Sequence, residues 1–207
     1  GIKWNDRYIE IRGAVCHEFH PTYGNLLDKP WIENDADVLK LQGINAVRNN
    51  HYPFPSYWYR FMQKFGLYVM DEANLNMSGF YRQNLNYPVD SILKGIALYR
   101  VKNMFERNKN YAHIIAWSLG YETGESEAIQ NAYRYIKSKD AKRPAAVVTG
   151  SASFGDLSFS SSENIGEQTQ KAEIVYRLST NQGNGLGGFD ESWEKVRSNQ
   201  RVAGGFV

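Results

Sequence analysis

The sequence predicts an α/β protein that closes into a compact (β/α)8 barrel. Three observations support this fold class: short β-rich runs alternate with amphipathic helical patterns, eight strand candidates can be counted, and polar residues follow several strand ends. With 207 residues, of which 42% are hydrophobic and 22% charged, the composition is that of an ordinary globular domain. We therefore expect a single barrel domain over residues 1–207.

The strand candidates are short runs rich in β-branched, aromatic and aliphatic residues. They cover residues 8–15, 46–48, 67–71, 114–119, 145–149, 157–161, 173–178 and 202–207. Five segments between them place apolar residues at helical spacing: 31–42, 57–65, 89–108, 126–139 and 187–198. The stretch 149–156 is too short for a helix, so one or two crossovers should be loops, in a barrel smaller than the typical ~250 residues.

A doubly wound open sheet is the structural alternative, because it also alternates strands with helices. That fold commonly carries a Gly-x-Gly-x-x-Gly turn after its first strand to hold a dinucleotide. No such turn occurs in this sequence. The barrel is therefore the favoured fold.

The composition limits which kinds of partner and which cellular environment the sequence suggests. Lys and Arg total 24 against 22 for Asp and Glu, without a basic cluster, so we expect no nucleic-acid binding. No run of eighteen apolar residues and no signal-peptide pattern occurs, so we expect a soluble protein without a membrane span, of unknown compartment. The only cysteine, Cys16, excludes an internal disulfide. The start lacks an initiator Met, so the chain could be a piece of a longer protein.

Polar residues follow four of the predicted strands, where a barrel assembles its site. They are His17, Glu18 and His20; Arg48, Asn49, Asn50 and His51; Asp71, Glu72 and Asn74; and Glu122. Each has a structural alternative: Glu122 could cap a helix, and Asp71 with Arg48 could form a buried ion pair. His17 and His20 could indicate zinc, but without further ligand motifs we expect no metal-ligand role. The convergence of four loops favours a functional site.

Several ordered motifs resemble the catalytic barrel of glycoside hydrolase family 2 β-galactosidases. They are Ile-Arg-Gly at 11–13 with His-Glu-Phe-His-Pro at 17–21, Asn-Ala-Val-Arg at 45–48 with His-Tyr-Pro at 51–53, Gly-Leu-Tyr-Val-Met-Asp-Glu-Ala-Asn at 66–74, and Trp-Ser-Leu-Gly at 117–120. The resemblance continues through residues 133–144, 183–189 and 204–206, and so spans nearly the whole chain.

This resemblance implies an enzyme that removes terminal β-linked galactose with retention of configuration. It matches the family's acid/base glutamate to Glu122, its sugar-binding histidines to His17 and His51, and its arginine beside the nucleophile to Arg48. It also implies a carbohydrate partner, galactoside-like, and β-sandwich domains or other subunits around the barrel.

The chain departs from the family pattern at positions that carry chemistry. Tyr121 stands where the family has an Asn that bonds the sugar. Asn76 and Ser78 replace two magnesium ligands, leaving Glu122 as the only matching one. Because a hard divalent cation needs several oxygen ligands, we expect no metal cofactor. The family's sugar-proximal Tyr matches Ser162.

Arg177 is the departure with the largest consequence. Anchored without gaps on Gly183 and Asn184, the nucleophilic glutamate falls at Arg177. A retaining glycosidase needs two carboxyl groups about 5–5.5 Å apart, and a guanidinium can neither form the glycosyl ester nor stabilise an oxocarbenium-like transition state. We expect Arg177 and Arg48 to form an ion-pair network with Glu122, Glu72 or Asp71 between them.

Two functional hypotheses remain open. In the first, the barrel is a β-galactosidase-type hydrolase that uses Glu163 as nucleophile, or that inverts through a water, with carboxyl groups ~6.5–9.5 Å apart. In the second, it is a non-catalytic descendant that binds a glycan or serves in an assembly, with Arg177 available to an acidic saccharide or a protein carboxylate. Family resemblance favours the first hypothesis, and the altered residues favour the second.

Overall fold

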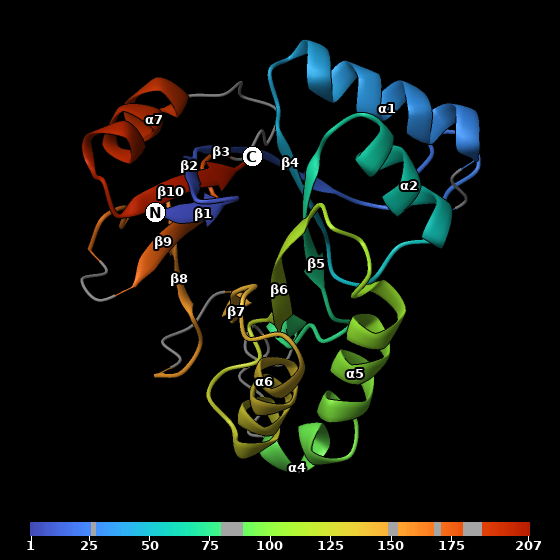
Figure 1. The fold of residues 1–207 in the computed structure, drawn as a ribbon, viewed down its shortest axis with the longest axis vertical. Helices are drawn as coiled ribbons and strands as arrows, with labels where there is room; N and C mark the ends of the chain where they lie inside the picture. Colours follow the sequence, from blue (N-terminus) through green and yellow to red (C-terminus); the bar gives the residue numbers. More distant parts are fainter. Residues whose placement is uncertain (26–27, 80–88, 149–152, 168–170, 180–187) are drawn as a thin grey trace.

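A computed structural model describes residues 1–25, 28–79, 89–148, 153–167, 171–179 and 188–207. Its centre is a sheet of eight strands: β3 (Ile11–Cys16), β4 (Ala46–Asn49), β5 (Tyr68–Glu72), β6 (Ile114–Tyr121), β7 (Ala145–Val148), β8 (Leu157–Ser161), β9 (Ala172–Arg177) and β10 (Val202–Phe206). Neighbouring strands pair in parallel in the order β7-β6-β5-β4-β3-β10-β9-β8 (Figure 1). The two edge strands of this order, β7 and β8, approach each other and nearly close the barrel. Asp156, directly before β8, donates its backbone N–H to the carbonyl of Ala145 in β7 at 2.9 Å. The predicted barrel is confirmed.

Helices cover the outside of this barrel (Figure 1). They are α1 (Lys29–Leu41), α2 (Ser56–Lys64), α4 (Val89–Lys94), α5 (Ala97–Asn108), α6 (Glu127–Lys139) and α7 (Phe189–Ser198). The single helix expected over 89–108 is two helices, which separate at Gly95, a residue that is unfavourable inside a helix. The described parts of the β7–β8 and β8–β9 connections contain no helix, as a short barrel requires.

The strand expected over 8–15 is wrong at its start. Residues 2–9 form an antiparallel hairpin of β1 (Ile2–Trp4) and β2 (Arg7–Ile9), and β3 begins at Ile11. Asn5 and Asp6 connect the hairpin with φ angles of 47° and 63°, the left-handed pair that a two-residue hairpin turn favours. Trp4 packs edge-on against Tyr68 at 5.7 Å, so the hairpin covers the end of the barrel where the strands begin.

Alternation along the strands separates two apolar layers. On β5, Tyr68 and Met70 pack in the barrel interior, whereas Val69 packs in the outer layer beneath the helices. The next two residues continue this alternation with carboxylates, Asp71 outward and Glu72 inward. Two adjacent residues thus place one carboxylate between the sheet and the helices and the other inside the barrel.

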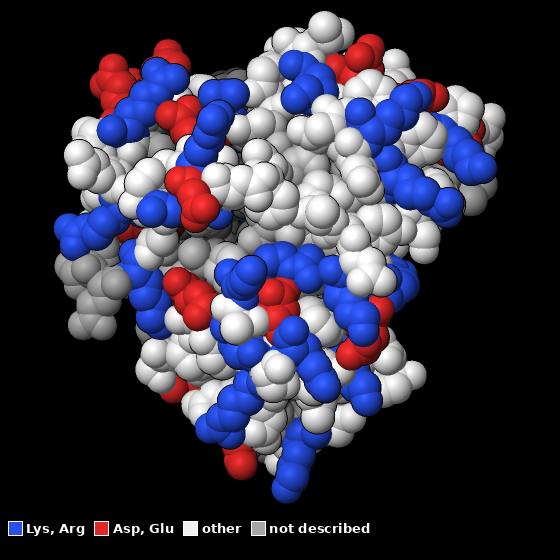
Figure 2. All heavy atoms as spheres, viewed as in Figure 1, with Lys and Arg blue, Asp and Glu red and all other residues white. Residues whose placement is uncertain are grey.

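The outer surface mixes charges of both signs. Figure 2 shows Asp and Glu side chains scattered among Lys and Arg on the face viewed. Among the described residues, no helix is both long enough and apolar enough to cross a bilayer.

Candidate active site

Glu72 is the centre of the polar cluster at the end of the barrel where the strands finish, which we call the mouth. Its side chain is fully buried. Its Oε1 lies 2.8 Å from Nδ1 of His51, and its Oε2 accepts a hydrogen bond of 2.8 Å from the Ser118 hydroxyl. The backbone N–H of Glu72 donates to the Asn49 side chain at 2.9 Å. Both carboxylate oxygens are therefore engaged from neighbouring strands.

Arg48 is the cation beneath this cluster and is only 2% exposed. Its Nε lies 3.5 Å from Oε2 of Glu72, and its Nη2 donates to the Asn50 side chain at 3.1 Å. Within the described part of the chain, Nε and Nη1 have no hydrogen-bond partner. A guanidinium carries five N–H donors, so Arg48 keeps unused hydrogen-bonding capacity in a buried place.

Asp71 faces the opposite way, and the alternative that it pairs with Arg48 is wrong. Its Oδ1 accepts hydrogen bonds from Asn49 at 2.8 Å and from the Tyr59 hydroxyl at 2.7 Å, and its Oδ2 accepts from Asn108 at 2.7 Å. Burial raises the pKa of Asp71 to about 6, against the opposing effect of these hydrogen bonds. Asp71 belongs to the wall between sheet and helices, not to the mouth.

Glu122 is held at the mouth by the backbone that precedes it. Gly120 has a φ of +126°, and a Cβ there would lie 2.6 Å from the Leu75 carbonyl oxygen, so only glycine fits. Glu122 itself has a φ of 51°, and its N–H donates to the Val148 carbonyl at 3.0 Å. A non-glycine residue in the left-handed region is typical of functional sites.

Tyr121 joins the sequence-predicted residues into one group. Its ring lies 4.6 Å from the His51 ring and 5.8 Å from the Arg48 guanidinium carbon. Burial, and next the charge of Glu122, raises the Tyr121 pKa to about 12, and the two side chains share a hydrogen bond. The Tyr121 phenol therefore stays protonated at neutral pH.

His17 lies at the outer edge of the same group. Its ring is 6.4 Å from that of His51, and its Nε2 is 3.3 Å from the Asn50 amide nitrogen. Burial lowers the His17 pKa, and the nearby His51 and Arg48 lower it further. The lowered pKa favours the neutral imidazole, which can accept a hydrogen bond at one ring nitrogen and donate one at the other.

Arg177 is not brought into an ion pair among the described residues. Its side chain is exposed, and its guanidinium carbon lies 5.8 Å from the Tyr176 ring. The ion-pair network expected around Arg48 and Arg177 is therefore wrong in its composition: Glu72 and His51 accompany Arg48, and Arg177 stands at the rim.

Tyr176 is a residue that sequence reasoning missed. It packs with the barrel interior, 6.2 Å from the Tyr121 ring, whereas Val175 and Leu178 on either side pack against Val196 of α7. The pairing of β8 with β9 shifts register between Val175 and Arg177, a bulge that re-aims side chains at the strand end. The alternation of Ala172, Ile174 and Tyr176 was the available signal.

Glu163, the second carboxylate considered from the sequence, is exposed in the turn after β8. The backbone of this turn adjoins the end of β9, since Ser162 donates its N–H to the Arg177 carbonyl at 3.1 Å.

The side chains at the matching metal positions, Asn76 and Ser78, carry no carboxylate or imidazole for a divalent cation. The side-chain amide oxygen of Asn76 accepts a hydrogen bond from the backbone N–H of Ser78 at 2.9 Å. Among the residues described, no three His, Cys, Asp or Glu side chains gather as ligands. The absence of a metal cofactor stays a prediction.

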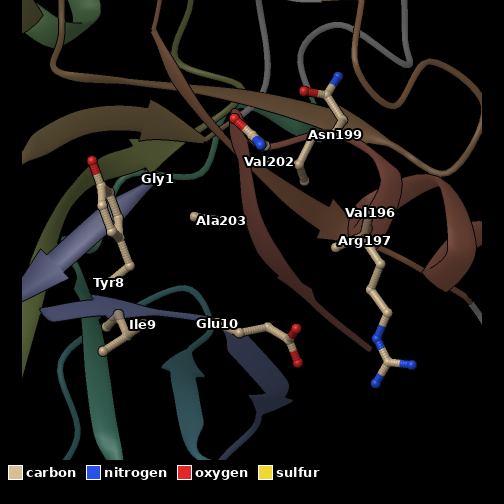
Figure 3. A pocket seen from close by; sticks show the side chains of 10 residues that line it. Gly1, Tyr8, Ile9, Glu10, Val196, Arg197, Asn199, Val202 and Ala203 are labelled. Atoms are coloured by element: carbon tan, nitrogen blue, oxygen red, sulfur yellow. The ribbon is translucent and has the colours of Figure 1, made fainter.

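A separate cavity of about 480 Å³ lies at the opposite end of the barrel (Figure 3). It is lined by the hairpin, the end of α7 and the start of β10, including Tyr8, Glu10, Arg197 and Val202. Because sites in such barrels form where the strands finish, we place the candidate active site at the mouth and not here.

The sequence profile described as "Glycosyl hydrolases family 2, TIM barrel domain" matches residues 2–207. The chain belongs to glycoside hydrolase family 2. It is 33% identical over its whole length to a β-galactosidase of Erwinia tasmaniensis and 31% identical to β-galactosidase 2 of Enterobacter cloacae. The chain spans only 22% of the length of each of these relatives.

Solved structures share the fold of this family 2 barrel. A β-glucuronidase from Ruminococcus gnavus in complex with D-glucuronic acid superposes with a TM-score of 0.77 at 19% identity, over 98% of this chain and 42% of that one. A family 2 β-galacturonidase from Eisenbergiella tayi bound to galacturonate gives 0.76 at 18% identity, over 98% and 44%. At these identities the likeness supports the fold alone.

Proposed function

We propose that this family 2 barrel binds a β-linked, galactoside-like saccharide at its mouth and does not cleave it by double displacement. The observation that carries the proposal is the single group formed by Tyr121, His51, His17 and Arg48 beside Glu122. Rings and imidazoles of this kind stack on and hydrogen-bond sugar rings. In this group, Glu122 is the residue that acts as a proton donor or forms a hydrogen bond with the sugar.

No second carboxylate is identified as a nucleophile among the described residues of the mouth, which argues against hydrolysis with retention. Glu72 points into the mouth, but its oxygens are engaged by His51, Ser118 and Arg48. Asp71 faces the helices, and Arg177 carries the wrong charge to attack an anomeric carbon. The cluster thus offers hydrogen bonds without an identified nucleophile.

Calorimetric titration with methyl β-galactoside, together with turnover of an aryl β-galactoside, tests this proposal. We expect binding without turnover. Glu122→Gln should weaken binding about tenfold, since a hydrogen bond to a charged group contributes about 1.5–3 kcal/mol. Glu125→Gln is the matched control, because Glu125 is an exposed neighbour whose carboxylate contacts Ser153, and it should leave binding unchanged. Turnover that disappears in Glu122→Gln would refute the binder.

Hydrolysis is the second candidate function, favoured by the 33% identity to a β-galactosidase and by the position of Glu163 beside the end of β9. In that case Glu163→Gln should abolish turnover as completely as Glu122→Gln does. Arg177→Glu is a further probe, because a gain of hydrolysis would identify one substitution as the cause of lost catalysis.

A further inference from the structure

The unused donors of Arg48 indicate that a binding group is missing from the mouth. A buried guanidinium is costly unless its N–H groups are satisfied, and Nε and Nη1 of Arg48 have no hydrogen-bond partner in the part of the chain described. Glu72, the carboxylate that pairs with Arg48 among the described residues, is shared with His51 and Ser118. The side chain can therefore accept a further anion without giving up its present contacts.

Tyr121 is the side chain that packs over this guanidinium. The 5.8 Å separation of the Arg48 guanidinium from the Tyr121 ring is a cation-π distance, and the ring also touches His51 and Tyr176. Tyr121 also shares a hydrogen bond with Glu122, and it remains partly exposed. A smaller side chain at this position would open space over Arg48 without moving a strand.

Two guanidiniums flank the aromatic rings at this part of the mouth, where Glu72 and Glu122 supply two carboxylates. Arg177 lies at the rim beside Tyr176, without a carboxylate partner among the described residues. Arg48 and Arg177 thus stand at the two ends of the Tyr121 and Tyr176 ring pair, each 5.8 Å from its ring. Such an arrangement places a guanidinium on each side of aromatic carbon on which an apolar sugar face can lie.

We propose that Arg48, beneath the ring of Tyr121, is a binding site for the carboxylate of an acidic saccharide. Guanidinium and carboxylate match as planar, charge-assisted hydrogen-bonding partners. Arg177 adds attraction at the rim. This inference rests on the proposed saccharide binding and names the chemical class that the site prefers.

The test compares D-galacturonic acid with galactose by calorimetric titration, using the whole chain and two variants of the covering ring. Tyr121→Asn removes the cover, and Tyr121→Phe keeps it as the matched control; circular dichroism checks that both are folded. We expect the wild type to prefer the acid, and Tyr121→Asn to raise the ratio of acid affinity to galactose affinity about tenfold, equivalent to about 1.4 kcal/mol. Tyr121→Phe keeps the ring over Arg48, so it should keep the wild-type ratio of the two affinities even where the loss of the hydroxyl weakens both. Arg48→Lys in the Tyr121→Asn background should remove the gain.

Acetate serves as the probe for a free carboxylate and should compete weakly. Acetate that binds as tightly as the sugar acid would overturn the assignment to a saccharide. Equal binding of galacturonic acid and galactose by the wild type and by Tyr121→Asn would overturn this inference and leave the proposed function standing. Failure of every sugar to bind would overturn both.

Discussion

Replacing His113 with Phe should change how the stability of this barrel depends on pH. His113 lies directly before β6, is 8% exposed and packs its ring 5.7 Å from that of Tyr111. Burial lowers its pKa from 6.5 to about 4. The folded chain therefore resists protonation of an imidazole that the unfolded chain protonates readily.

The sign and size follow from linkage. A group whose pKa is depressed on folding contributes its full stability above pH 6.5, and that stability is lost as the pH falls toward 4. A shift of this size corresponds to about 2–3 kcal/mol after allowance for partial solvent screening. Phe keeps the ring but cannot titrate. Relative to wild type, His113→Phe should thus gain about 2–3 kcal/mol between pH 7 and pH 4.

Urea unfolding at pH 4, 5, 6 and 7, with the free energy of unfolding extrapolated to water, measures this difference. Taking the variant minus the wild type at each pH cancels the titration of all other groups. Tyr111→Phe is the control, because it alters the neighbouring ring without removing a group that titrates in this range. A His113→Phe difference that is the same at pH 4 and pH 7 would refute the reasoning.

Three further predictions concern Asp71, Gly120 and Cys16. Asp71→Asn should show the opposite pH trend to His113→Phe. Because the Asp71 pKa is raised in the folded chain, the wild type loses up to ~3 kcal/mol of stability as the pH rises from 3.8 to about 6. Urea unfolding should therefore show Asp71→Asn gaining stability relative to the wild type over that pH range. Gly120→Ala should cost at least about 2 kcal/mol in the same assay and should weaken sugar binding, because the Cβ meets the Leu75 carbonyl and displaces Glu122. Cys16 should react with iodoacetamide at pH 8 about a thousandfold more slowly in the folded chain than in urea, since burial, helped by Asp35, raises its pKa to about 12; equal rates would contradict this.

The spacing of apolar residues along the sequence predicts most of the architecture. The eight strands of the barrel and the order of the described helices follow from residue spacing, because strand and helix periodicities are set by neighbours along the chain. The same patterning failed at the first strand, where the left-handed Asn5 and Asp6 turn was not recognised, and at Gly95, where one helix is two.

The candidate site divides in the same way. The sequence determined which polar residues follow the strands, and the structure brings Arg48, His51, His17 and Tyr121 together beside Glu122. Only the tertiary structure decided that Glu72, and not the adjacent Asp71, faces Arg48, and that Tyr176 turns inward at the end of β9. The physical reason is that facing depends on strand register and bulges, which are fixed by pairing and burial across the barrel and are not encoded in the spacing of any one segment.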